Sequence, residues 1–66
     1  MKATLAKQYV NADDGVEGRV WANEDGTYNV TLFDLDAEQT VTATARIRIP
    51  SLDDAIKLAK SWANVA

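Results

Sequence analysis

Cysteine and histidine are both absent from this chain of 66 residues. The lack of cysteine excludes a disulfide framework and a thiol nucleophile, and the two absences together remove the side chains of ordinary structural zinc sites. Nucleophilic catalysis by Ser51 or Ser61 would lack a histidine base, so the sequence does not predict an enzyme. It predicts no cofactor either.

Long apolar runs are also missing. No stretch approaches the roughly 20 apolar residues that span a bilayer, and residues 1–7 lack the apolar region of a signal peptide. We therefore expect a cytoplasmic protein that does not enter a membrane. The length predicts a single domain, residues 1–66, with a thin core, because a chain of this size buries only about 60% of its unfolded surface.

Charge is modest and acidic overall. Ten acidic and seven basic residues leave a net charge of −3. This balance disfavours general binding to nucleic acid, because affinity for phosphates grows with the number of cationic contacts. The acidic residues cluster in segments that look like turns, whereas Arg19, Arg46 and Arg48 lie in segments that look like strands. A local basic patch therefore remains compatible with the overall charge.

Turn signals divide the chain into strands. Asp13–Gly15 and Asn23–Gly26 combine acidic or amide side chains with glycine, as tight turns do, and Asp36–Gln39 is a looser third turn. The expected strands cover residues 3–10, 16–22, 27–34 and 40–49. Because the connections are short, the sequence predicts an antiparallel meander.

The last of these strands has the clearest pattern, an unbroken alternation of polar and apolar residues from Thr40 to Ile49. Side chains of a strand alternate between its two faces, so each set predicts one face. The expected core face carries Val41, Ala43, Ala45, Ile47 and Ile49. The expected solvent face carries Thr42, Thr44, Arg46 and Arg48.

The other strands have less uniform patterns. In the third strand Tyr28, Val30 and Leu32 are expected on the core face, which leaves Phe33 outside; in the second, Trp21 is expected on the solvent face together with Glu17 and Arg19. The first strand stays open. Either Leu5 and Tyr9 point inward, with Ala3, or Ala6 and Val10 do, or a bulge reconciles both patterns.

A helix is expected over residues 52–64. Ser51 is a suitable N-cap, and Asp53 and Asp54 favour the positive end of the helix dipole. An apolar stripe at helical spacing comprises Leu52, Ala55, Ile56, Ala59, Trp62, Ala63 and Ala66. We therefore predict an α+β fold, β-β-β-β-α, with a four-stranded antiparallel sheet, one C-terminal helix on one face and the other face open.

The uncovered sheet face is the first candidate for function. Its predicted binding residues are Arg19, Trp21, Phe33, Thr42, Thr44, Arg46 and Arg48. Exposed aromatic side chains beside arginines are typical of protein interfaces. They are also typical of platforms that stack unpaired bases. A protein partner, including a homodimer through this face, is the leading expectation; single-stranded nucleic acid and an ordinary solvated surface are the alternatives.

Acidic residues form the second candidate, an alternative binding surface at Asp34, Asp36 and Glu38. The spacing of these residues does not match a calcium-binding loop, so solvated turns are the favoured interpretation and no metal site is predicted. Clustered carboxylates can also imitate a phosphate backbone and occupy a nucleic-acid-binding site on another protein.

Two segments resemble HicB-type antitoxin domains. Glu24–Leu35 has an acidic-glycine turn followed by a strand that ends at an Asp-Leu pair, and Ser51–Ala55 opens a helix with serine and acidic residues, followed by Ala59. The resemblance covers Glu24–Ala63. The chain departs from the family in lacking its prolines and glycine around the Asp-Leu pair and in placing a long strand before the helix.

The resemblance implies a small non-enzymatic domain that neutralises a partner by direct contact. No functional residue is carried over from it. With the open face and the acidic charge, it leads to the hypothesis of an inhibitor or regulator that binds its partner stoichiometrically. Antitoxins, and the small proteins by which phages and mobile elements block host defence, are of this kind.

Overall fold

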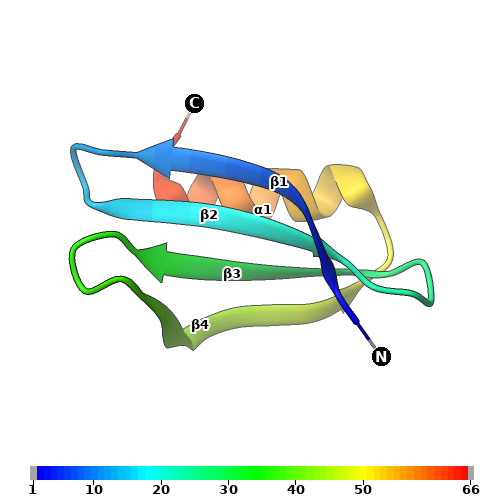
Figure 1. Ribbon diagram of the computed structural model, residues 1–66. Helices are drawn as coiled ribbons and strands as arrows, with labels where there is room; N and C mark the ends of the chain where they lie inside the picture. The colour runs from blue at the N-terminus through cyan, green and yellow to red at the C-terminus, as the bar shows by residue number, and fades with distance from the viewer. Residues whose placement is uncertain (1, 66) are drawn as a thin grey trace.

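The computed structural model describes residues 2–65 and has the predicted α+β fold, with four antiparallel strands in the order β1-β2-β3-β4 and one helix packed on the sheet (Figure 1). Ala66, the last residue of the predicted helix stripe, lies outside the described residues. The elements are β1 Thr4–Asn11, β2 Val16–Ala22, β3 Tyr28–Asp34, β4 Gln39–Ile49 and α1 Leu52–Ala63.

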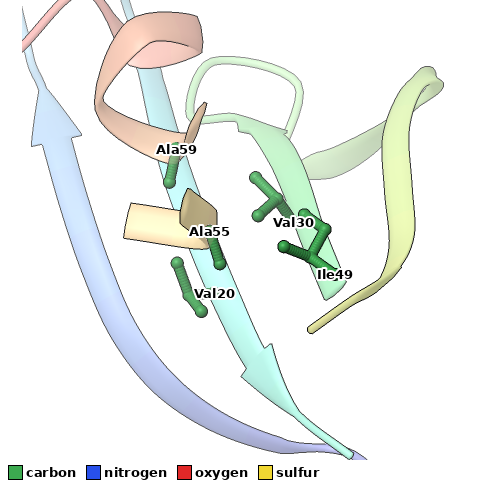
Figure 2. Close-up of a cluster of buried hydrophobic side chains, with 5 residues drawn as sticks. All are labelled: Val20, Val30, Ile49, Ala55 and Ala59. Atoms are coloured by element: carbon green, nitrogen blue, oxygen red, sulfur yellow. The ribbon is translucent and has the colours of Figure 1, made fainter. Parts of the chain in front are cut away.

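The central strands β2 and β3 supply the largest fully buried side chains of the core. Their register is uninterrupted from Val16 opposite Asp34 to Ala22 opposite Tyr28, and Val20 pairs with Val30. Both of these valines are fully buried beneath Ala55 and Ala59 of the helix, and Ile49 closes the cluster (Figure 2). Alternation in these two strands therefore predicted the buried face correctly.

Glycine at position 18 allows the helix to lie close to β2. A Cβ atom at Gly18 would collide with the backbone carbonyl of Ala59, which cannot move without displacing the helix. The facing helix residues are themselves small: they are the alanines Ala55, Ala59 and Ala63, and all three are fully buried. Backbone proximity therefore replaces large side chains as the means of excluding water from this thin core.

Both ends of α1 are capped. Ser51 Oγ accepts a hydrogen bond from the Asp54 backbone N–H at 3.4 Å, which confirms the predicted N-cap. At the other end Asn64 takes the left-handed conformation, and its backbone N–H donates to carbonyls of the last turn. The side chain of Asn11 donates to the Ala63 carbonyl at 2.8 Å, which ties β1 to the end of the helix.

A bulge between Leu5 and Lys7 resolves the orientation of β1. After the bulge Tyr9 pairs with Gly18 and packs against the core, whereas Leu5 pairs with Trp21 on the opposite side of the sheet. Val10 is 55% exposed. Of the alternatives left open by the sequence, the bulge is the one that the structure contains.

The expected core face of β4 is wrong except at Ile49. Two register shifts separate β4 from the regular ladder, one between Tyr28 and Val30 and one between Thr31 and Phe33. The first places Arg46 opposite Val30, on the helix side, and turns Ala45 to the other side. Ile47 is 64% exposed. The exposed part of the predicted core set comprises Ala43, Ala45 and Ile47, with Val41 half-buried.

The bulge at Arg48 accounts for this inversion. Arg48 has a φ of 57°, in the left-handed region, and its backbone N–H donates to Oδ1 of Asn29 at 3.1 Å. A residue in this conformation adds one position to β4 without adding one to β3, and a shift of one residue exchanges the two faces of a strand. The alternation of the sequence therefore does not continue as one buried face.

Candidate functional site

The face of the sheet away from α1 is uncovered, and we call it the open face. Register with β2 and β3 determines which side chains belong to it. Its members are Leu5, Gln8, Val10, Glu17, Arg19, Trp21, Asn29, Thr31, Phe33, Thr40 and Ala45. The face therefore combines two aromatic rings and several aliphatic side chains with few charges.

The centre of the open face is a connected group around Arg19. The Arg19 guanidinium carbon lies 3.9 Å from the centroid of the Phe33 ring, within the range of a cation–π contact. Arg19 Nε also donates to Oε2 of Glu17, and Gln8 Nε2 donates to the same oxygen at 3.4 Å. Glu17 is only 6% exposed, and the ion pair with Arg19 balances its buried charge inside this group.

Trp21 is held by a polar contact of its own. Its indole Nε1 donates to Oγ1 of Thr31 on the neighbouring strand at 2.8 Å. The ring is half-buried, beside Leu5, which is 38% exposed and pairs with Trp21 across the β1–β2 ladder. The hydrogen bond orients the indole, while part of its apolar surface stays accessible to a partner.

Of the predicted binding residues, Arg19, Trp21 and Phe33 meet at the centre of the open face. Arg46 is a correction, since it pairs with Val30 on the helix side. Arg48 lies at the bulge, where it borders a hollow at one end of the open face. The two threonines, Thr42 and Thr44, lie in the irregular part of β4 between the pairs Phe33–Thr40 and Thr31–Ala45. The register shift at Arg48 therefore removes Arg46 from the predicted surface, and the other shift leaves Thr42 and Thr44 outside the paired ladder.

Sequence reasoning missed other members of the open face. The sequence placed Glu17 on the solvent side of β2, but the predicted site did not include it. Its alternation with Arg19 and Trp21 was the signal that could have added it to the site. Leu5, Gln8 and Val10 were missed for a different reason. The bulge in β1 breaks the period of two, so no single alternation assigns these residues to one face.

The acidic candidate residues lie at one end of the sheet. The turn after β3 meets the turn after β1, where the Leu35 N–H donates to the Gly15 carbonyl at 2.9 Å. Asp34 Oδ1 accepts from the backbone N–H groups of Asp36 and Ala37, both at 3.0 Å, so this carboxylate organises its own turn. Asp36 and Glu38 are exposed. Within residues 2–65 no group of three potential ligand side chains is placed to hold a metal ion.

A shallow hollow of about 280 Å³ lies at the other end of the open face. Its lining includes Asn23 and Asn29, whose side-chain amides bond each other, and the edge residues Ile47 and Arg48. Hydrogen bonds from the Thr27 side chain and then its backbone N–H lower the pKa of Asp25 below its ordinary value of 3.8. These contacts organise the β2–β3 turn.

Comparisons with protein-family models, with curated proteins and with solved structures found no match. The resemblance to HicB-type antitoxin domains therefore stays a prediction. In the described part of the chain, no helix has the length and apolar character needed to cross a membrane.

Proposed function

We propose that this protein binds a protein partner through its open face and acts stoichiometrically, as an inhibitor or regulator of the antitoxin or anti-defence kind. The observation that carries the proposal is the pairing of charge on that face. Because Arg19 and Glu17 neutralise each other there, a partner can cover the aromatic and aliphatic side chains without burying an unpaired charge.

Trp21 and Phe33 are the expected anchors. Large aromatic side chains near the centre of an interface contribute disproportionately, and truncating one to alanine costs about 2 kcal/mol or more, which is roughly thirtyfold in affinity. Val10 and Leu5 extend the apolar surface around them. This arrangement supports a protein partner more than an ordinary solvated face.

The test is affinity capture from the native host followed by mass spectrometry. Trp21→Ala and Phe33→Ala are each expected to lose the partners that the unchanged protein retains, with a Lys57→Ala variant on the exposed side of α1 as the matched control. Circular dichroism verifies that each variant is folded. Recovery of the same partners by a folded Trp21→Ala/Phe33→Ala double variant would contradict the proposal.

Single-stranded nucleic acid is the second candidate and has weaker support. Arg46 lies on the helix side, and Arg19 is already engaged by Glu17, so few cations remain on the open face for phosphates. The alternative predicts quenching of Trp21 fluorescence by oligonucleotides at low salt, measured in a Trp62→Phe background so that Trp21 is the source. Absence of quenching removes this candidate.

The acidic surface provides a third arm of the same experiment. If Asp34, Asp36 and Glu38 made the contact, then replacing Asp36 and Glu38 by their amides would abolish capture while Trp21→Ala would not. Asp34 is left unchanged in that variant, because its carboxylate holds the turn. The two outcomes therefore assign the contact to one surface or the other.

A further inference from the structure

The outer edge of β4 is long and little protected. The strand has eleven residues, lies at the end of the sheet and contacts α1 less than any other strand does (Figure 1). From Gln39 to Ala45 it carries no charge and no proline, and threonine, valine and alanine dominate. Natural edge strands are usually blunted by charges or proline, because their unpaired N–H and C=O groups can pair with another strand.

The opposite edge, β1, has these protections. The charged side chain of Lys7 stands in the middle of the strand. Asn11 ties its end to the helix through the Ala63 carbonyl. The two bulges of β4 shift its register against β3, but positive φ angles occur only at Glu38 and Arg48, just before the strand and near its end. Residues 39–47 therefore have no positive φ angle, although residues 41–44 lie outside the paired ladder with β3.

Charge is polarised along this edge. Asp36 and Glu38 lie in the turn just before β4, and Arg46 and Arg48 lie near its end. The pairs Gln39–Asp34 and Ile49–Tyr28 are six β3 residues apart, or about 20 Å, so Glu38 and Arg48 cannot neutralise each other within one molecule. Within residues 2–65 none of these four side chains forms an ion pair. Asp54 borders the hollow beside Arg46 on the helix side.

We propose that the outer edge of β4 pairs antiparallel with the same edge of a second copy of this chain. In that arrangement the acidic beginning of each β4 meets the basic end of the other, and every charge contact occurs twice about the two-fold axis. With Ala43 on the axis, Glu38 of each copy stands opposite Arg48 of the other. The strand centre then contains only small side chains, which let the two backbones approach.

The dimer would extend the open face. An antiparallel pair with its two-fold axis perpendicular to the sheet forms one eight-stranded sheet with both helices on the same side. The open faces then adjoin on the other side, and neither is covered. Pairing through β4 does not depend on the proposed partner-binding function, but it would offer two copies of that surface to a partner, which raises avidity.

The experiment measures the mass of the protein by light scattering and sedimentation over a concentration series. We expect twice the 7.2 kDa of one chain at high concentration. Glu38→Arg or Arg48→Glu alone is expected to weaken dimerisation about tenfold, because each change places like charges opposite each other twice. The double swap Glu38→Arg/Arg48→Glu restores it. Both positions have left-handed φ angles, so exchanging these residues preserves the demand on the backbone.

Two further variants locate the interface. Ala43→Lys brings two lysines together at the axis and is expected to yield monomers, whereas the matched control Lys57→Glu on α1 keeps the dimer. Circular dichroism shows that each variant is folded. A monomer throughout the series, or a dimer that neither swap weakens, would overturn the proposal.

A dimer lost in Trp21→Lys but kept in Arg48→Glu would assign self-association to the open face and would also overturn it. If Trp21→Ala loses its partners while the mass of the protein stays that of the dimer, the result supports the proposed function and leaves the pairing through β4 unaffected. The two proposals can therefore fail separately.

Discussion

The central pair β2–β3 and the edge strand β4 have the same kind of sequence but different structures. Both alternate polar and apolar residues, and the alternation of β4 is the longer. In β2–β3 the register is regular and the apolar set faces the helix, with Val20 and Val30 fully inaccessible. In β4 the register shifts twice and only Ile49 reaches the core.

The difference comes from what covers each strand. An α-helix with its side chains is about 10–12 Å wide, whereas four strands spaced by about 4.8 Å place their outer axes about 14 Å apart. One helix therefore cannot cover the whole sheet, and α1 packs on β2 and β3 far more than on β4. Alternation indicates a strand, but a covering layer is needed to select the buried face.

The largest expected effect is at Gly18, where β2 touches the helix. Gly18→Val places side-chain atoms against the Ala59 backbone, so the helix must move away, and we expect a loss of about 3 kcal/mol in the free energy of unfolding. Ala43→Val, on exposed β4, is the matched control and should stay within about 0.5 kcal/mol. Urea denaturation measures both. Equal effects at the two positions would remove the distinction between the strands.

Two isoleucines on β4 make the comparison within one strand. Ile49→Ala is expected to cost about 2–3 kcal/mol, because Ile49 is 9% exposed and packs in the central cluster. Ile47→Ala should cost less than about 0.5 kcal/mol, because Ile47 is mostly in solvent. Thermal and urea unfolding provide the values. A larger loss at Ile47 would mean that the regular alternation is correct and the bulge is not.

A smaller effect of opposite sign is expected at the bulge. Arg48→Gly removes the strain of a left-handed conformation, about 1 kcal/mol, and part of this gain is offset by the greater freedom of glycine in the unfolded chain. We expect a net stabilisation of about 0.5 kcal/mol. Arg46→Gly, at a paired position without positive φ, should instead destabilise. If both changes destabilise the protein, the left-handed conformation assigned to Arg48 is wrong.

The smallest effect concerns the turn between the regular strands β2 and β3. Thr27 lowers the pKa of the Asp25 carboxyl below 3.8 in the folded protein, so this group stabilises the turn above that pH. The contribution falls as the pH drops through the folded pKa, when the carboxylate is protonated. NMR titration should show the Asp25 carboxyl titrating below 3.8, the ordinary value for aspartate. A pKa at or above the ordinary value would be inconsistent with the Thr27 contacts.

Much of the fold follows from local chemistry. Turn residues and the Ser51 cap locate the ends of all five elements to within one residue of the predicted bounds, because these signals act over three or four neighbouring residues. The candidate site was predicted less completely. Arg19, Trp21 and Phe33 share the open face as expected, since the β2–β3 ladder has no bulge. Arg46 does not, because its face depends on a backbone conformation at Arg48.

The sequence by itself determined where strands, turns and the helix lie, and which face of β2 and β3 is apolar. Only the tertiary structure decided the face of each β4 and β1 residue, the pairing of Glu17 with Arg19, and the exposure of Ile47. The physical reason is the distance along the chain over which each signal acts. Caps and turns depend on near neighbours, whereas burial and register depend on how far one helix reaches across a four-stranded sheet.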